Sequence, residues 1–116
     1  MDINSFTSIN ALLVSALKDI LPVAHDQYSG TAKTYGLFTI YNRLPEMNAS
    51  GKNHSIGIYG DLDVFSDIDL SAESSIVGTI TAALNNAGFI GKDISDVPYD
   101  GISHHVLIEF YYSKSR

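Results

Sequence analysis

The chain has 116 residues, a formal net charge of −6 at pH 7 and 45% hydrophobic residues, which is typical of one folded domain spanning residues 1–116. Its seven Lys and Arg residues are scattered, which argues against a basic surface that grips nucleic acid. The lack of cysteine excludes disulfides, thiol catalysis and Cys-ligated metals, and no 18-residue apolar run or basic leader occurs, so we expect neither a membrane span nor a signal peptide.

The first expected element is a helix from about Asn4 to Ile20, which Pro22 ends soon afterwards. A short strand is expected over residues 23–26, and residues 27–33 have the composition of a turn. The apolar stripe of the helix, which we expect to pack on a sheet, consists of Ile3, Phe6, Ile9, Leu13, Ala16, Leu17 and Ile20.

A second strand is expected from Thr34 to Asn42. Large side chains alternate on both of its faces, which predicts that its outer face is also covered, by this chain or by another. The segment 42–53 has no periodic apolar pattern, and we expect a long loop with Leu44 and Met47 as apolar tips. Loops of this length are often functional, so we interpret it as an arm that contacts a partner, with a mobile surface loop as the alternative.

The stretch from His54 to Ala87 is expected to be the centre of the fold. Its first half alternates with a period of two, which is typical of a strand with one covered face. The even positions Ile56, Ile58, Leu62 and Val64 form the predicted core face, and the odd positions Tyr59, Asp61, Asp63 and Phe65 form the other face.

A helix follows, with Asp69 or Ser71 as its expected N-cap and Gly88 as its left-handed C′ residue. We expect a polar connection over residues 91–100, with a short strand at 95–97. A final strand is expected over residues 104–112, paired antiparallel with the central strand and followed by a short basic tail. The apolar stripe of the helix consists of Ile76, Val77, Ile80, Ala83, Leu84 and Ala87.

These elements predict an α+β fold: a mainly antiparallel sheet of about four to five strands with two helices packed on one face.

The acidic residues around the end of the central strand are the strongest candidates for chemistry. Asp61 and Asp63 point the same way from a strand, and Asp67 and Asp69 follow closely, so one interpretation is a hard-cation or catalytic carboxylate site. The spacing does not match a calcium-binding loop. We therefore interpret them as a solvated or interface-facing acidic edge.

Other chemistry is not expected. The adjacent His104 and His105 point to opposite faces of a strand and cannot jointly bind one metal. The sequence has no G-x-S-x-G nucleophile elbow and no Gly-rich phosphate loop. We expect no enzyme activity, no catalytic, metal or cofactor-binding residues, and no cofactor.

Tyrosines are concentrated in the expected strands, more than single-sided burial can hide. Tyrosine is favoured in protein–protein contacts because its ring buries area while its hydroxyl stays hydrogen-bonded. This pattern favours an oligomer.

The chain resembles the small tail-terminator, or tail-completion and head-to-tail joining, proteins of long-tailed bacteriophages. The resemblance covers nearly the whole chain, and its motifs are apolar patterns with a few fixed aromatic residues. The strand "LDVFSD" over residues 62–67 and the helix end "AALNNAGF" over residues 82–89 are most similar to the family. The steps "YSG" at 28–30 and "YGLFTIY" at 35–41 follow the family order.

The resemblance implies a structural virion protein, assembled in the host cytoplasm, that forms a hexameric ring on the tail tube. Such a ring halts tube polymerisation, contacts the tube protein and the head-completion or neck proteins, and lets DNA pass through its lumen without specific binding. No membrane is involved. The residues that we expect at the contacts between subunits or with partners are Tyr35, Tyr41, Leu44, Met47, Tyr59, Asp61, Asp63, Phe65 and Tyr111.

Three alternatives stay open at this point. A head-closure or minor capsid connector shares these features and differs in the partner that it contacts. A metal-dependent hydrolase would use Asp61, Asp63 and His104. A small regulatory binding module would be a monomer or a dimer.

Overall fold

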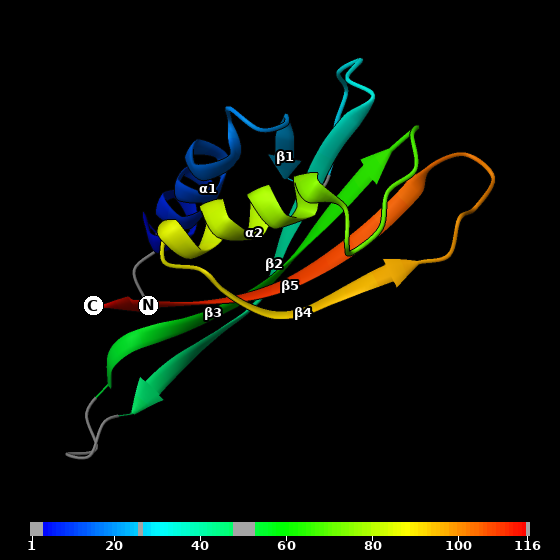
Figure 1. The fold of residues 1–116 in the computed structure, drawn as a ribbon. Coiled ribbons are helices and arrows are strands. Elements are labelled where there is room, and N and C mark those ends of the chain that lie inside the picture. Colours follow the sequence, from blue (N-terminus) through cyan, green and yellow to red (C-terminus); the bar gives the residue numbers. More distant parts are fainter. Residues whose placement is uncertain (1–3, 26, 48–52, 116) are drawn as a thin grey trace.

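The computed structural model describes the backbone of residues 4–25, 27–47 and 53–115, and the side chains of residues 9–25, 27–42 and 57–113. In chain order the elements are α1 (Asn4–Leu17), β1 (Val23–His25), β2 (Thr34–Met47), β3 (Asn53–Ser66), α2 (Ser75–Asn86), β4 (Ile90–Val97) and β5 (His104–Ser115) (Figure 1). In the described ranges, no helix has the length and apolarity that a membrane crossing requires.

The strands form one sheet in the order β1-β2-β3-β5-β4. β1 and β2 are parallel, and every other neighbouring pair is antiparallel. The predicted α+β class, with a mostly antiparallel sheet, is confirmed, as is the antiparallel pairing of the last strand with the central one. β5 therefore lies inside the sheet, between β3 and β4, although it follows both in the chain.

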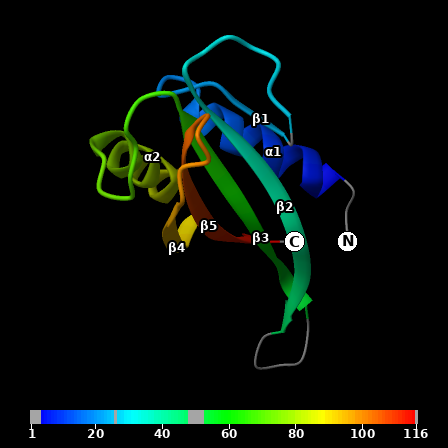
Figure 2. The same cartoon turned by 90° about the vertical axis from the view of Figure 1, so that its right-hand side faces the viewer.

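Both helices pack on the same face of the sheet, which Figure 1 and Figure 2 show from two directions. The buried residues of α1 are Ile9, Leu13 and Leu17, and those of α2 are Val77, Ile80 and Leu84. Each fully buried side chain of this kind contributes roughly 1.5–3 kcal/mol of hydrophobic stabilisation. The sheet supplies the other half of this core with Phe38, Ile58, Leu62, Val64, Val106, Ile108 and Phe110.

The first helix is shorter than predicted, because α1 ends at Leu17 and not at Ile20. The N–H groups of Ile20 and Leu21 both donate to the Leu17 carbonyl, at 2.9 and 3.2 Å, which closes the helix with a tight turn. Leu21 is only 4% exposed, so the turn directs its side chain into the core. The early end of the helix thus allows Leu21 to join the core.

The loop predicted over residues 42–53 is wrong for most of its length. β2 continues to Met47 and β3 begins at Asn53, and the two pair as a long antiparallel hairpin with a bulge between Ile40 and Asn42. A ladder of backbone hydrogen bonds needs no apolar alternation, which is why the sequence pattern did not reveal it. Residues 48–52 lie outside the described part.

This hairpin extends beyond the helices as an arm (Figures 1 and 2). The molecule measures 51 Å along its longest axis and 25 and 23 Å across it. We call the paired strand ends 40–47 of β2 and 53–59 of β3 the hairpin arm.

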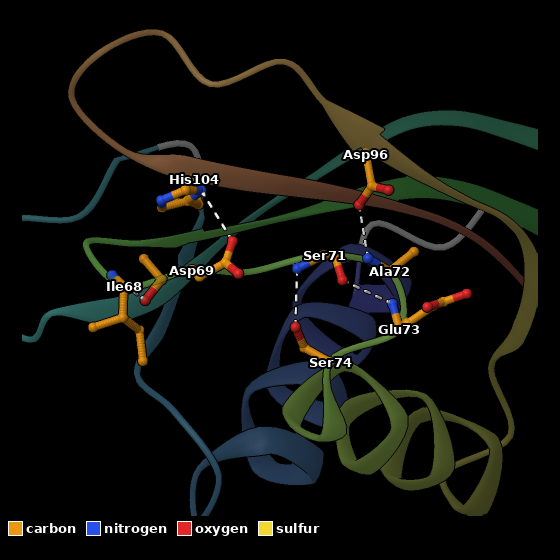
Figure 3. A network of polar contacts seen from close by, with 9 residues as sticks. Ile68, Asp69, Ser71, Ala72, Glu73, Ser74, Asp96 and His104 are labelled. Carbon is orange, nitrogen blue, oxygen red and sulfur yellow. Dashed lines mark hydrogen bonds and ion pairs between the residues drawn. The ribbon is translucent and has the colours of Figure 1, made fainter.

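The second helix begins later than predicted, with Ser74 as its N-cap in place of Asp69 or Ser71. Side chains hold the backbone before it: Ser71 N–H donates to Oγ of Ser74 at 2.9 Å, and Ala72 N–H donates to Oδ1 of Asp96 at 2.7 Å (Figure 3). These bonds hold residues 71–74 in a turn that precedes the helix, where Ser74 N–H also donates to the Ser71 carbonyl at 3.0 Å, so the helix starts after this turn.

The end of α2 follows the prediction. Gly88 has a φ of 99°, a left-handed conformation that favours glycine. Phe89 N–H donates to the Leu84 carbonyl at 2.9 Å, and the Phe89 ring is buried.

The short strand predicted at 95–97 is confirmed, but the polar connection predicted before it is wrong, because β4 already begins at Ile90 and runs to Val97. β4 is an edge strand with most side chains exposed, so its sequence lacks the alternation that marks a half-buried strand. The predicted tail after residue 112 is strand as well, since β5 stays paired with β3 up to Ser115.

Candidate interaction surface on the sheet

The sheet face opposite the helices is the candidate functional site, and we call it the open face. None of the described helices covers it (Figures 1 and 2). Its side chains are mostly half-buried by one another and not by a second layer. The register of β2, β3 and β5 arranges them in rows across the strands, made up of Tyr35, Phe65 and His105; Leu37, Asp63 and Leu107; Thr39, Asp61 and Glu109; and Tyr59 and Tyr111.

One end of the open face is a ladder of stacked rings. Tyr28 stacks on Tyr35 with centroids 4.7 Å apart, Tyr35 on Phe65 at 5.4 Å, and Phe65 on His105 at 4.2 Å. Each such pair adds roughly 0.5–1.5 kcal/mol beyond the area that it buries. The ladder gives this end a rigid aromatic surface.

A second aromatic group lies toward the hairpin arm. The rings of Tyr59 and Tyr111 are 5.0 Å apart, and the Lys92 ammonium lies 5.2 Å from the Tyr59 centroid and 6.0 Å from that of Tyr111. These are cation–π distances. The pair of tyrosines thus already holds a cation of its own chain.

Carboxylates occupy the row between the two aromatic groups. Asp61 is directly opposite Glu109 in the β3–β5 register, and like charges in that arrangement repel each other. Oδ1 of Asp61 is buried and has no hydrogen-bond partner among the described residues. Burial, and then the charges of Glu109 and Asp63, raise the pKa of Asp61 above its ordinary value.

Two other side chains, His105 and Tyr41, interact with carboxylates in or beside this row. Nε2 of His105 donates a hydrogen bond to Oδ1 of Asp63, 2.6 Å away. Desolvation and the nearby carboxylates of Asp61 and Glu109 raise the pKa of the Tyr41 hydroxyl. Tyr41 is 54% exposed, which is a large exposed area for a tyrosine on a strand.

The structure brings most of the predicted interface residues onto this one surface. The open face holds Tyr35, Tyr59, Asp61, Asp63, Phe65 and Tyr111, with Tyr41 beside its acidic row. Leu44 and Met47 belong to β2 in the hairpin arm, and their side chains lie outside the described part. That these residues contact a partner stays a prediction.

Asp67 and Asp69 do not join the acidic row. Both follow the end of β3 and are exposed, and Asp69 lies 3.8 Å from Nδ1 of His104 (Figure 3). Asp100 forms a separate turn, where its carboxylate accepts hydrogen bonds from the N–H groups of Ser103 and Ile102, and these bonds lower its pKa.

Sequence reasoning missed Tyr28 and Lys92 as members of the surface. Tyr28 lies in a segment whose apolar residues have no periodicity. Lys92 lies beside the register shift in β4, which no sequence pattern predicts. Glu109 could have been found, because it alternates with the core residues Ile108 and Phe110 and therefore shares the face of Asp61.

The three residues of the hydrolase alternative do not come together. Asp61 and Asp63 lie on the open face, where Asp63 pairs with His105, whereas His104 lies on the other side of its strand beside Asp69. Over the part of the chain that the structure describes, no three His or acidic side chains are grouped as metal ligands.

No model of a known protein family matches the chain, and no curated protein sequence matches it.

Proposed function

We propose that this protein is a structural virion component that caps a bacteriophage tail tube as a ring and joins the tail to the head. The observation that carries the proposal is the open face, a sheet surface of aromatic and acidic rows that no described helix covers. Half-buried tyrosines with polar neighbours are typical of surfaces that meet another protein. The sequence resemblance in "LDVFSD" and "AALNNAGF" supplies the particular class.

In this proposal the protein acts through the geometry of its assembly and not by catalysing a reaction. Each subunit presents two different patches, so that one patch of a subunit meets the other patch of its neighbour and the series closes into a ring. The formal charge of −6 suits a ring through which DNA passes, because acidic walls repel phosphates. In this proposal the hairpin arm contacts the neighbouring subunit or the tube.

The hairpin arm offers a clean test, which is to delete residues 47–52. Glu46 and Ser55 already pair across the hairpin, so the deletion leaves Asn53 and His54 as a two-residue turn between them. The change His54→Gly makes this turn Asn-Gly, the sequence that two-residue hairpin turns prefer. The shortened protein is therefore expected to fold, with the same thermal melt as a full-length His54→Gly control.

In a phage that carries the deletion, we expect tails that fail to join heads, and no infectious particles. Negative-stain microscopy of the purified full-length protein should show rings, and the shortened protein should not form them. Normal infectious particles from the deletion would overturn the proposal. Added Mg²⁺, Mn²⁺ or Zn²⁺ should leave the thermal melt unchanged, whereas a clear upward shift would favour the metal-dependent hydrolase.

A further inference from the structure

β4 leaves one edge of the sheet without a strand partner in the described ranges. β5 pairs with one side of β4, and no described strand pairs with its other side. The backbone N–H and C=O groups along such an edge form a template for a further strand. Two large apolar side chains of β4 are exposed beside it, Ile90 at 58% and Ile94 at 38%.

A groove runs between this edge strand and α2. Its volume is about 480 Å³, within the range of sites that hold a ligand or a peptide segment. Leu84 and Asn85 of α2 line one side, and Ile90, Gly91 and Ile94 of β4 line the other. An edge strand beside a helix-lined apolar groove is the arrangement in which proteins bind an extended segment as an added strand.

Gly91 lies in this edge strand at the start of the register shift between Gly91 and Asp93. Its backbone is not left-handed, and an added Cβ would meet no atom within 4 Å. Gly60, in the middle of the sheet, is different: a Cβ there would lie 2.6 Å from the Phe110 ring. A strand glycine marks either a bulge, as at this register shift, or a place where another backbone approaches closely, and the open space at Gly91 leaves room for such an approach.

The opposite edge of the sheet supplies a segment that fits. β1 covers β2 only from Gly36 to Phe38, and beyond Ile40 no described strand pairs with the outer side of β2. β2 and β4 run antiparallel to each other, because three antiparallel pairings separate them. Copies placed side by side without inversion would therefore pair the β4 edge of one with the β2 edge of the next as a regular antiparallel ladder.

We propose that the outer edge of β2 in the hairpin arm of one copy docks as an added strand on β4 of the next copy, over the groove beside α2. The docking proposal depends on the proposed function in one respect. It takes the assembly to be a series of copies in which each copy contacts the next in the same head-to-tail way. The contact is heterologous, so it leaves an unpaired edge at each end of an open series and none in a closed ring.

Disulfide trapping tests the docking directly, because the natural chain has no cysteine. Asn42→Cys in the arm is mixed with Asp93→Cys or Ser95→Cys in β4 under mild oxidation, at protein concentrations up to about 1 mM. A disulfide needs Cα atoms within roughly 4.4–6.8 Å, which strand neighbours provide. We expect mixed dimers of twice the 12.6 kDa chain, at least tenfold above those with Gly78→Cys on the outer side of α2.

A yield no higher than that of the Gly78→Cys control would overturn the docking. So would disulfides that form only between two β4 cysteines, since these would indicate a two-fold contact between like edges.

The second variant is Gly91→Gln, which the free chain accommodates because the space around Gly91 is open. Its melt should match the wild-type melt, while light scattering shows loss of association; Gly78→Gln, a matched change at another open glycine, should still associate. Association of Gly91→Gln at the wild-type concentration would overturn the proposal.

The two proposals fail in different ways. Rings without the mixed disulfide, together with defective particles from the arm deletion, would refute the docking alone. Mixed disulfides together with normal phage tails from Gly91→Gln would refute the tail function alone.

Discussion

The two faces of the sheet differ in what covers them and in the side chains that they carry. Along β3, residues that are neighbours in sequence point either into the helix-covered core, where Leu62 and Val64 are fully buried, or onto the open face, where Asp61 and Asp63 are half-exposed. The covered face is mostly apolar and is buried by contacts within the chain, and its one described buried polar side chain, Ser66, is hydrogen-bonded to Thr34. The open face contains paired like charges and a buried carboxylate oxygen with no described partner. Folding alone explains the first face but not the second, which is why we place function there.

Truncating leucines on the two faces should give the largest difference. Leu62→Ala removes a fully buried side chain and should lower the free energy of unfolding by about 3 kcal/mol. Leu107→Ala removes a half-exposed leucine from the open face of the neighbouring strand and should cost about 1 kcal/mol or less. Urea denaturation at pH 7 measures both. Equal losses would mean that the open face is packed as a core and is not free for a partner.

Glycine substitutions compare the centre of the sheet with its β4 edge, and their expected effect on stability is smaller. Gly60→Ala would bring a Cβ within 2.8 Å of the Thr39 carbonyl oxygen and 2.6 Å of the Phe110 ring, and overpacking of this kind costs about 1–3 kcal/mol. Gly91→Ala, in the edge strand, should be neutral or stabilise by about 0.5 kcal/mol, because it only restricts the unfolded chain. Thermal melts compare the two. A destabilised Gly91→Ala would contradict the open space seen at that edge.

The outer side of α2 should behave as plain solvent surface. Gly78 is exposed inside the helix, and a Cβ there meets no atom within 4 Å. Gly78→Ala should therefore raise the free energy of unfolding by up to about 1 kcal/mol, through helix propensity alone. Ring formation should not change. If this variant lost assembly, the interface would lie on the helix side and not on the sheet.

The smallest effect is expected from the carboxylate row. Asp61→Asn removes one of two like charges that face each other across β3 and β5, and should stabilise the protein by about 0.5 kcal/mol at pH 7. The pKa of Asp61 is raised in the folded state, so its penalty arises as the pH rises through that pKa and is absent below the ordinary value of 3.8. Denaturation at pH 3 and pH 7 tests this sign.

The gain from Asp61→Asn should vanish at pH 3, and the exposed control Asp67→Asn should show no gain at either pH. A gain that is equal at both pH values would show that charge is not its cause.

The sequence predicted those parts of the fold whose side chains alternate because one face is covered. The core positions of β3, the stripe of α2 and the left-handed Gly88 follow from burial and backbone sterics, which leave a local pattern. Residues 43–47 of β2 and 90–94 of β4 were missed because they pair through backbone groups and their sequences have no apolar alternation. The N-cap of α2 was misplaced because Asp96, distant in sequence, binds the backbone before the helix.

The candidate site was predicted in part for the same reason. Tyr59, Asp61, Asp63 and Phe65 share a face by simple alternation, so they could be grouped from sequence. Alternation also gives the face on which Glu109 lies, but its position directly opposite Asp61 depends on strand order and register, and no short-range pattern encodes either.

The position of β5 inside the sheet also bears on the order in which the protein can be built. β5 is the last described strand to be synthesised, yet it separates β3 from β4. At roughly 5–20 residues per second, the ribosome needs roughly 1–4 seconds to proceed from the end of β4 to the end of β5. During that interval a nascent chain holds two halves of a sheet with no strand to join them. We therefore predict that chains arrested before His104 are cleaved rapidly by protease, and that chains arrested well after Ser115 resist it.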